Sequence, residues 1–184
     1  MIQGVLLAAG AGRRMGMPKA LVHDQAGESW LLRCVEALRE GGCEDVTVVL
    51  GAAADRALPL LDGARVDVVV AADWAEGMGA SLRAGLGSLG PGAEAALVTL
   101  VDLPDVGADV VRRVAAAADG PGVLARAAYG GVPGHPVLLG RDHWVGVSES
   151  ATGDRGARDY LAGREVTLVE CGDLATGRDR DTPG

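Results

Sequence analysis

Short runs rich in Val, Leu and Ala recur through the N-terminal half, and they constrain the fold more than any other feature of the chain. The runs at residues 5–9, 46–50, 66–70 and 95–101 are each long enough for one buried strand. Segments with a helical spacing of apolar residues separate them. Continuous apolar strands that alternate with helices are typical of a parallel sheet covered on both faces. We therefore predict an α/β fold with a mostly parallel sheet and helices on both faces.

Helices are predicted at residues 30–40, 80–89 and 107–118, and Ser29 is placed to cap the first of them. Beyond residue 120 glycine and proline become frequent. We predict an irregular C-terminal third there, with a short helix at residues 155–162 and a final strand at 166–169. A length of 184 residues without internal repeat or linker indicates a single domain, residues 1–184.

The charge and cysteine content exclude several classes of function. A formal net charge of −8 disfavours binding to nucleic acid or to an anionic membrane surface. No apolar run approaches the roughly 18 residues of a membrane span, and no basic leader of a secretory signal precedes the first strand. Cys34, Cys43 and Cys171 lack the paired spacing of a metal site. We expect a cytoplasmic protein whose oligomeric state the sequence leaves open.

The single lysine of the chain lies in a glycine-rich loop directly after the first predicted strand, whereas arginine occurs sixteen times. The loop carries three glycines and three cations, namely Gly10, Gly12, Gly16, Arg13, Arg14 and Lys19. Glycines let main-chain N–H groups approach an anion closely, and an ammonium is a compact charge that a guanidinium does not replace. The loop is therefore predicted to bind a polyphosphate, with a solvated lysine in an ordinary turn as the alternative.

Two familiar phosphate loops do not fit this segment. A Walker A loop needs Gly-Lys followed by Ser or Thr, whereas Lys19 lies between Pro18 and Ala20. A dinucleotide fingerprint needs G-x-G-x-x-G spacing and an acidic residue near the end of the second strand. Here the third glycine comes one residue late, and residues 50–52 carry no carboxylate. A dehydrogenase-type dinucleotide site is therefore disfavoured.

Residues 7–21 resemble the signature L-A-A-G-x-G-x-R-M-G-x-P-K-x-L of nucleotidyltransferases with a Rossmann-like sheet. Further segments resemble later motifs of the MobA-like NTP transferases in the same order: residues 74–83, 102–104, 134–136, 153–158 and 179–183. Within that family the chain most resembles the molybdenum-cofactor cytidylyltransferase group. The resemblance covers nearly the whole length and implies a Rossmann-like nucleotidyltransferase fold.

The resemblance implies Mg²⁺-dependent transfer of a nucleoside monophosphate from an NTP to a phosphate monoester such as molybdopterin, with release of pyrophosphate. CTP is placed ahead of GTP because residues 7–10 look more like the cytidylyl branch. A molybdoenzyme or its chaperone is implied as a partner. A sugar phosphate or another small phosphate monoester is the alternative acceptor, and a nucleotide-binding regulatory domain without turnover is the alternative of another class.

The resemblance also assigns residues to the nucleotide. Arg13 and Lys19 would hold the triphosphate and stabilise the leaving pyrophosphate, and together with Asp102 they form the implied catalytic set. Arg14 is left open between a phosphate contact and solvent. The residues implied to contact the nucleotide are Leu7, Ala8, Ala9, Gly10, Gly12, Arg13, Lys19, Gly79, Ser81 and Asp102.

A carboxylate that follows a strand can hold Mg²⁺ over the strand ends, and Asp102 directly follows the fourth predicted strand. Capping of the next turn is the alternative, and we assign that role to Asp105. Asp181 is implied as a second metal ligand, with a solvated tail as the alternative.

Three further residues are candidates for the acceptor. His135 lies between Gly134 and Pro136, in what we expect to be an extended, exposed turn. Arg155 and Arg158 are spaced to share one helical face and to bind the phosphate of the acceptor. A surface ion pair with a neighbouring aspartate is the alternative for these two arginines.

Overall fold

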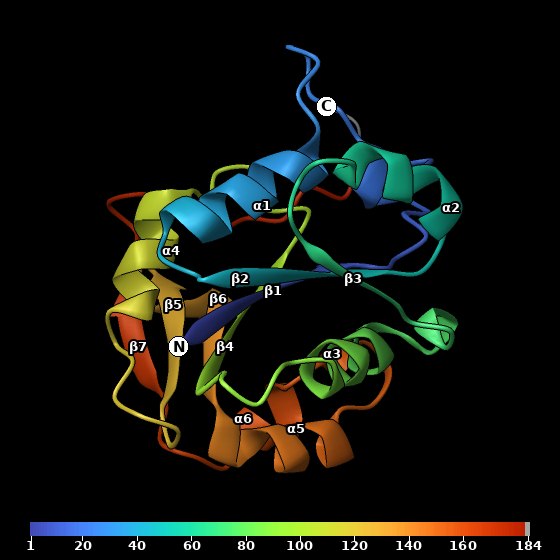
Figure 1. Cartoon of the computed structure of the whole chain (residues 1–184). Helices are drawn as coiled ribbons and strands as arrows, with labels where there is room; N and C mark the ends of the chain where they lie inside the picture. The colour runs from blue at the N-terminus through green and yellow to red at the C-terminus, as the bar shows by residue number, and fades with distance from the viewer. Residues whose placement is uncertain (183–184) are drawn as a thin grey trace.

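The computed structural model describes residues 1–182, which form a seven-stranded sheet with the order β3-β2-β1-β4-β6-β5-β7 (Figure 1). The strands are β1 (Ile2–Ala8), β2 (Asp45–Leu50), β3 (Asp67–Val70), β4 (Ala95–Leu100), β5 (Leu124–Tyr129), β6 (Val132–Gly140) and β7 (Thr167–Glu170). The pairs β3–β2, β2–β1, β1–β4 and β5–β7 are parallel, and the two pairs that involve β6 are antiparallel. The prediction of an α/β fold with a mostly parallel sheet is confirmed.

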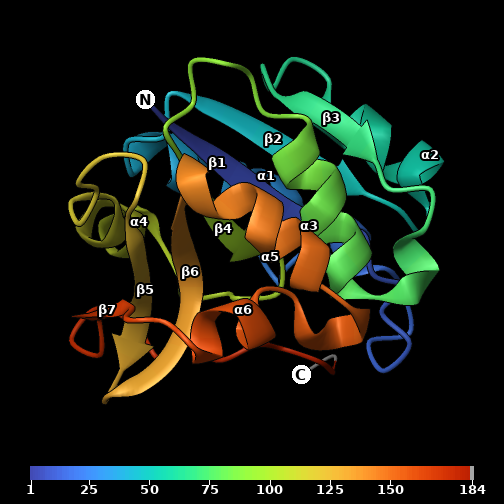
Figure 2. The same cartoon turned by 90° about the horizontal axis from the view of Figure 1, so that it is seen from below.

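Helices cover both faces of the sheet, as expected from its continuous apolar strands. On one face lie α1 (Trp30–Glu40), α2 (Ala54–Ala57) and α4 (Ala108–Ala115). On the other lie α3 (Met78–Gly87), α5 (Trp144–Ser150) and α6 (Arg158–Ala162), which Figure 2 shows in front of the sheet. Ser29 caps α1 as predicted, because its hydroxyl accepts a hydrogen bond from the Leu32 N–H at 3.4 Å.

The strand order places a crevice between the ends of β1 and β4. The chain builds β2 and β3 on one side of β1 and then crosses to β4 on its other side, so the order reverses at this point. Ligands of open α/β sheets bind in the crevice outside the carboxyl ends of strands where the order reverses. Leu7 of β1 pairs with Leu100 of β4, and the loops that follow both strands therefore leave the sheet side by side.

The expectation of an irregular C-terminal third is wrong in its detail. β5 and β6 form an antiparallel hairpin that extends the sheet beyond β4, and α5 packs beneath it. The segment expected as one helix at residues 155–162 is a 3₁₀ turn, η5 (Gly153–Arg155), followed by α6. The other predicted strands and helices are present with shifts of up to three residues at their ends.

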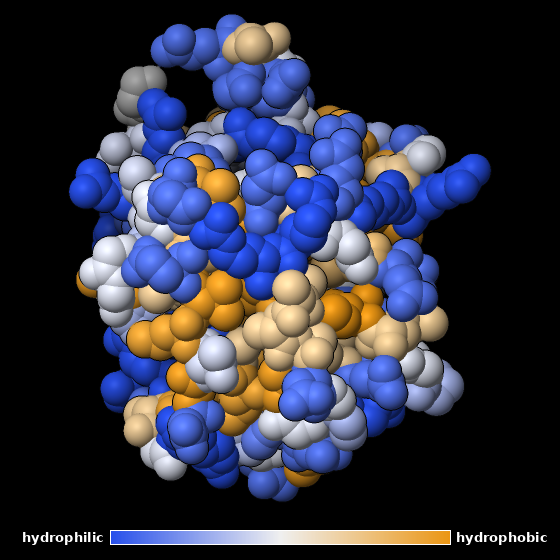
Figure 3. Space-filling model, turned by 90° about the vertical axis from the view of Figure 1, so that its left-hand side faces the viewer, coloured by the Kyte–Doolittle hydropathy of each residue, from blue (hydrophilic) through white to orange (hydrophobic). Residues whose placement is uncertain are grey.

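The core consists mainly of Leu, Val and Ala packed as two layers, one on each side of the sheet, in a chain without phenylalanine. All three cysteines are buried and free, which agrees with the absence of any paired spacing. Apolar surface gathers on the face at the β7 end of the sheet (Figure 3), where Leu168 of β7 is 49% exposed. Among residues 1–182, the helices are too short or too polar to cross a membrane.

Candidate functional site

The loop after β1 is shaped by glycine. Gly12 has φ +62°, and a Cβ atom there would lie 1.9 Å from the Met17 carbonyl oxygen, so no other residue fits this turn. The Gly16 N–H donates back to the Gly12 carbonyl at 2.9 Å and closes the loop. The chain then enters a 3₁₀ turn, η1 (Lys19–Leu21), which brings Lys19 to the end of β4.

A cleft of about 450 Å³ opens at the carboxyl ends of β1 and β4. Ten of its lining residues are predicted site residues, namely Leu7, Ala8, Ala9, Gly10, Gly12, Arg13, Lys19, Ser81, Asp102 and Asp181. The other lining residues come from the same loop, from the turn before α3, from the end of β4 and from η5. The structure thus brings the strand-end residues and the loop cations to one cavity.

Lys19 lies between two carboxylates at the centre of this cleft. Its Nζ donates to Asp102 Oδ2 and to Asp181 Oδ1, each at 2.6 Å. The Lys19 and Asp102 side chains are 17% and 13% exposed, so this contact is shielded from water. Burial alone would lower the pKa of Lys19, but the two hydrogen-bonded carboxylates outweigh it and raise that pKa. The same contact with Lys19 lowers the pKa of Asp181.

Three carboxylates fit the metal that the resemblance implies. One oxygen atom each from Asp102, Asp179 and Asp181 lie within 4.8 Å of one another. A set of carboxylate oxygens beside a phosphate-binding loop is the donor chemistry that Mg²⁺ takes in nucleotide sites. The alternative that Asp181 lies in a solvated tail does not hold, since it meets Lys19 inside the cleft. Asp179 was not predicted, although it lies two residues before Asp181 in the same motif. Pro183, the last residue of that motif, lies outside the described residues.

Asp105 has a different role from the predicted helix cap. α4 has Gly107 at its N-cap and no side-chain cap. The Asp105 carboxylate instead accepts hydrogen bonds from the Thr176 N–H at 2.7 Å, the Thr176 hydroxyl at 2.6 Å and the Gly177 N–H at 3.2 Å. The Arg180 N–H also donates to the Asp102 carbonyl at 2.9 Å. These bonds hold the C-terminal segment against the end of β4.

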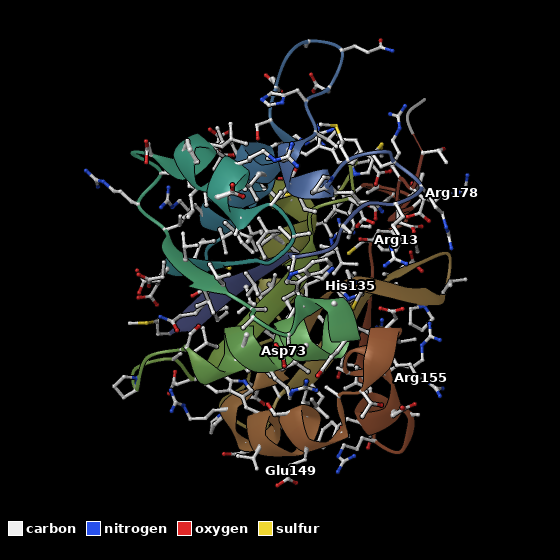
Figure 4. The ribbon with its side chains drawn as sticks, turned by 90° about the vertical axis from the view of Figure 1, so that its right-hand side faces the viewer. Arg13, Asp73, His135, Glu149, Arg155 and Arg178 are labelled. Atoms are coloured by element: carbon white, nitrogen blue, oxygen red, sulfur yellow. The ribbon has the colours of Figure 1, made fainter. Side chains whose placement is uncertain are left out.

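Arg13 and Arg14 both line the cleft. The resemblance assigns only Arg13 to the triphosphate and leaves the role of Arg14 open. In the register of the signature quoted above, its arginine falls on Arg14. Arg14 is 78% exposed and contacts Asp181 at 3.2 Å, whereas Arg13 has no carboxylate partner within residues 1–182. Figure 4 shows Arg13 on the same side of the molecule as Arg178 of the C-terminal segment. Both Arg13 and Arg14 are therefore candidates for a triphosphate contact.

One wall of the cleft comes from the turn η3 (Trp74–Glu76) and the start of α3. Trp74 can lie there because Gly51 leaves room, since a Cβ on Gly51 would be 2.5 Å from the Trp74 Cβ. Ser81 lines this wall, but Gly79 does not. A Cβ on Gly79 would lie 2.9 Å from the Ala151 carbonyl carbon, so this glycine serves the packing of α3 against the chain after α5. Trp74 was missed as a site residue, although it opens the motif at residues 74–83.

The acceptor candidates lie outside the residues that line the cleft. His135 is not in an exposed turn but is a half-buried residue of β6. Burial and the nearby Arg126 guanidinium lower its pKa to about 4, so the imidazole is neutral at pH 7. Arg155 pairs with Asp159 at 3.2 Å, which is the surface ion pair given as the alternative. Arg158 is exposed and has no ion pair in the described part of the chain.

Comparisons with known proteins agree with this geometry. Residues 4–169 match the model of the MobA-like NTP transferase domain. The chain is 36% identical to a nicotine blue oxidoreductase of Paenarthrobacter nicotinovorans, over 98% of this chain and 92% of that protein. It is also 36% identical to a molybdenum cofactor guanylyltransferase of Rhodobacter capsulatus, over 78% of this chain and 66% of the relative.

Solved structures show the same fold. A nucleotidyl transferase from Methanothermobacter superposes with a TM-score of 0.79 at 26% identity, covering 93% of this chain and 87% of its own. The manganese complex of Rv0371c from Mycobacterium tuberculosis superposes with a TM-score of 0.75 at 27% identity, covering 97% and 93%. A divalent metal therefore occurs in a structure of this kind. The fold, the order of the motifs and the family match over most of the length agree, and the chain belongs to the MobA-like NTP transferase family.

Proposed function

We propose that this chain transfers a nucleoside monophosphate from an NTP to a phosphate monoester and releases pyrophosphate. The observation that carries the proposal is the contact of Lys19 with Asp102 and Asp181 in one cleft at the carboxyl ends of β1 and β4. Cations for a triphosphate and carboxylates for a metal lie within one nucleotide-sized cavity. We further propose that residues 1–184 act as one domain in the cytoplasm, where three free cysteines stay reduced.

The reaction needs positioning and charge neutralisation more than covalent chemistry. An oxygen of the acceptor phosphate forms a bond to the α-phosphorus of the NTP. The bond from that phosphorus to the oxygen that bridges to the β-phosphate breaks, and pyrophosphate leaves with the electron pair. Lys19 supplies positive charge where the leaving group becomes more negative, and Arg13 and Arg14, which both line the cleft, are candidates to add to it.

The carboxylates serve the metal, and the loop after β1 serves the triphosphate. Asp102, Asp179 and Asp181 are the residues that would hold Mg²⁺. The cation supplies positive charge against the phosphate oxygens. The main chain around Gly12 lies along the triphosphate, and Trp74 offers a flat apolar wall for the base. Small Ala8 and Ala9 at the end of β1 leave space for close approach of the nucleotide.

We propose molybdopterin as the acceptor and CTP ahead of GTP as the donor. The acceptor is supported by the relative named molybdenum cofactor guanylyltransferase. The name of that relative favours GTP, whereas residues 7–10 look more like the cytidylyl branch, so the assay must include both. A molybdoenzyme or its chaperone would then receive the product.

The decisive assay is a screen for pyrophosphate release with four NTPs against molybdopterin and a panel of sugar phosphates and other phosphate monoesters, with Mg²⁺ or with EDTA. The proposal expects release only when NTP, acceptor and Mg²⁺ are all present. NTP binding without pyrophosphate release in any combination would instead indicate a regulatory nucleotide-binding domain.

An oxidoreductase is the second candidate, favoured by the 36% identity to nicotine blue oxidoreductase over 98% of the chain. Against it, the loop lacks the dinucleotide spacing and no carboxylate follows β2 within residues 50–52. Oxidation of NADH or NADPH with a quinone-type dye, in a preparation that releases no pyrophosphate, would replace the transferase proposal by this one.

A further inference from the structure

Asp154 is a carboxylate of the cleft that has no cationic partner in the described part of the chain. Three acids line the cleft, namely Asp102, Asp154 and Asp181. Asp102 and Asp181 each contact Lys19 at 2.6 Å. Asp154, by contrast, makes neither a salt bridge nor a side-chain hydrogen bond with any residue from 1 to 182. It therefore offers its carboxylate oxygens to a ligand, and the mechanism proposed above does not use it.

Close packing fixes Asp154 beside the start of α3. Gly77, the residue before the helix, has φ +115°, and a Cβ atom there would lie 2.6 Å from Asp154 Oδ1 and 2.6 Å from the Gly153 carbonyl oxygen. Arg83 of α3 donates to the Ala151 carbonyl and so ties the chain before η5 to the helix, as the neighbouring ribbons in Figure 2 show. The carboxylate thus belongs to a defined wall of the cleft.

The same wall carries hydrogen-bond donors. α3 begins at Met78 without a side-chain cap, so the N–H groups of its first turn have no partner within the helix. Ser81, nearly one turn further, is 4% exposed, lines the cleft and has no side-chain hydrogen bond among the described residues. A ligand on this wall would therefore meet donors from the start of α3 and, beside them, the acceptor oxygens of Asp154.

The charges of the cleft decide which part of a nucleotide lies on this wall. The cations that line the cleft, Arg13, Arg14 and Lys19, all follow β1. An unpaired carboxylate repels phosphate groups, so Asp154 adds to the preference of a triphosphate for the cationic loop. The nucleoside of a bound NTP is therefore directed to the wall that Trp74, α3 and η5 form.

The bases differ in what they offer to a wall of this kind. Cytosine presents the acceptors O2 and N3 and, next to them, an amino group at C4 that donates. Uracil carries a carbonyl oxygen in place of that amino group, and this oxygen would face a carboxylate oxygen. Guanine also carries an amino group, at C2, beside the donor N1–H. Donors with an adjacent carboxylate therefore match cytosine and guanine and disfavour uracil.

We propose that the Asp154 carboxylate accepts a hydrogen bond from the amino group of the base. The inference rests on the proposed function and narrows its donor to nucleotides with an amino group, CTP or GTP, over those that lack it. The loop after β1 contacts groups common to all NTPs, so it cannot make this distinction. Asp154 is thus a specificity-determining residue rather than a ligand of the metal.

The test is isothermal titration calorimetry of the full-length protein with two matched pairs of nucleotides, CTP with UTP and GTP with ITP. In each pair only the first base carries the amino group. Mg²⁺ is present and the acceptor is omitted, so that no transfer occurs. Wild type is expected to bind the amino member of one pair about tenfold or more tightly than its partner. In Asp154→Asn this preference is expected to be lost, and UTP should bind more tightly than to wild type, because an amide can donate to a carbonyl oxygen.

Asp159→Asn is the matched control. It removes one negative charge from α6, outside the residues that line the cleft, and should keep the preference of wild type. Thermal unfolding compares the folding of both variants with wild type, and a gain in UTP affinity cannot arise from misfolding.

Three results would overturn the inference. Wild type could show no preference for the amino member of either pair, or Asp154→Asn could keep the preference of wild type. Equal weakening of both members of a pair would place Asp154 on a group that they share, such as a ribose hydroxyl. In each of these cases nucleotide still binds and the proposed function stands. If no nucleotide binds, the proposed function fails, and the inference fails with it.

Discussion

Lys19 contacts two of the carboxylates that would hold a divalent cation. Its ammonium donates to Asp102 and Asp181 at 2.6 Å, so in the absence of ligand one positive charge is shared by two of the three clustered carboxylates. A metal that binds there competes with the ammonium, and a triphosphate offers the ammonium new oxygens. Metal and nucleotide are therefore expected to bind more tightly together than separately.

The substitution Lys19→Ala separates two roles of the ammonium, namely binding of the triphosphate and competition with the metal for the carboxylates. We expect turnover to fall by about 10²–10³, the usual effect of removing one preorganised donor to developing charge. Mn²⁺ alone should bind more tightly than to wild type, because the competing ammonium is gone. Steady-state kinetics and electron paramagnetic resonance of free Mn²⁺ measure the two effects. Turnover close to that of wild type would remove Lys19 from the mechanism.

Asp105 makes the stability of the protein depend on pH. Burial alone would raise its pKa, but the hydrogen bonds from Thr176 and Gly177 outweigh burial and lower the pKa below its ordinary value. A carboxyl with a lowered folded-state pKa stabilises the protein above its unfolded pKa of about 3.9, and this contribution is lost as the pH falls through the folded pKa.

We therefore expect Asp105→Asn to lower the free energy of unfolding by a constant amount between about pH 5 and 7, with the difference from wild type shrinking below about pH 4. Urea unfolding followed by circular dichroism at several pH values measures this difference. Asp119→Asn serves as the control, because Asp119 is exposed and has no hydrogen-bonded side chain in the described residues. A difference that does not change with pH would contradict the assigned role of Asp105.

At the scale of single residues, the sequence predicts what lies within one motif and misses what separate segments bring together. The loop glycines, Lys19 and Asp102 lie at strand ends, where spacing alone indicates their chemistry. Asp154 lines the cleft from η5, and Arg126 reaches the residue before His135 from β5. Neither placement can be inferred without knowing that β5 and β6 extend the sheet next to β4.

Helix α3 positions part of the cleft through a close approach to the sheet. A Cβ on Gly85 would lie 2.8 Å from Val5 Cγ1 and 3.1 Å from Val49 Cγ2, so the helix backbone nearly touches β1 and β2. Met78 and Ser81, which line the cleft, belong to the same helix. A displacement of α3 would therefore move the wall of the nucleotide site.

We expect Gly85→Ala to destabilise the protein by about 1–3 kcal/mol, the usual effect of overpacking a core, and to raise the KM for the NTP. Gly87→Ala in the same helix is the control, because a Cβ there meets no atom within 4 Å. That control should be neutral or stabilising by up to about 1 kcal/mol, since Ala favours a helix over Gly. Equal melting temperatures for the two variants would contradict the packing role of Gly85.

The apolar pattern did not predict the strands β5 and β6 of the C-terminal third, and their residues show why. β6 contains Pro133 and Pro136, which remove donors from the ladder and argue against a central strand. The register between β5 and β6 shifts between Arg126 and Ala128, so an irregularity of the hairpin lies opposite the proline-containing segment. By contrast β1, β2 and β4 are mostly apolar and contain no proline, and these strands were predicted to within three residues.

Segments from both halves of the chain close the cleft, and the last of them belongs to no strand. Asp181 reaches the cleft, and Asp179 comes close to Asp102, through a segment tied down by Asp105 and by the Arg180 N–H. The sheet and its helices are complete by residue 170. Folding and metal binding should therefore be separable.

A chain that ends at Arg178 keeps the bonds between Asp105 and Thr176 but lacks Asp179 and Asp181. We expect it to unfold in one cooperative transition close to that of wild type and to lose at least tenfold in Mn²⁺ affinity. Thermal unfolding and electron paramagnetic resonance provide the two measurements. Wild-type Mn²⁺ affinity in this shortened chain would show that Mn²⁺ binds at Asp102 without help from Asp179 or Asp181.

The distance along the chain between Lys19 and Asp181 has a consequence for biosynthesis. A ribosome synthesises the glycine loop first and the last aspartates some 160 residues later, after the residues of all seven strands. The sheet can therefore form before the segment with Asp179 and Asp181 docks. A molecule with that segment undocked would be folded but inert.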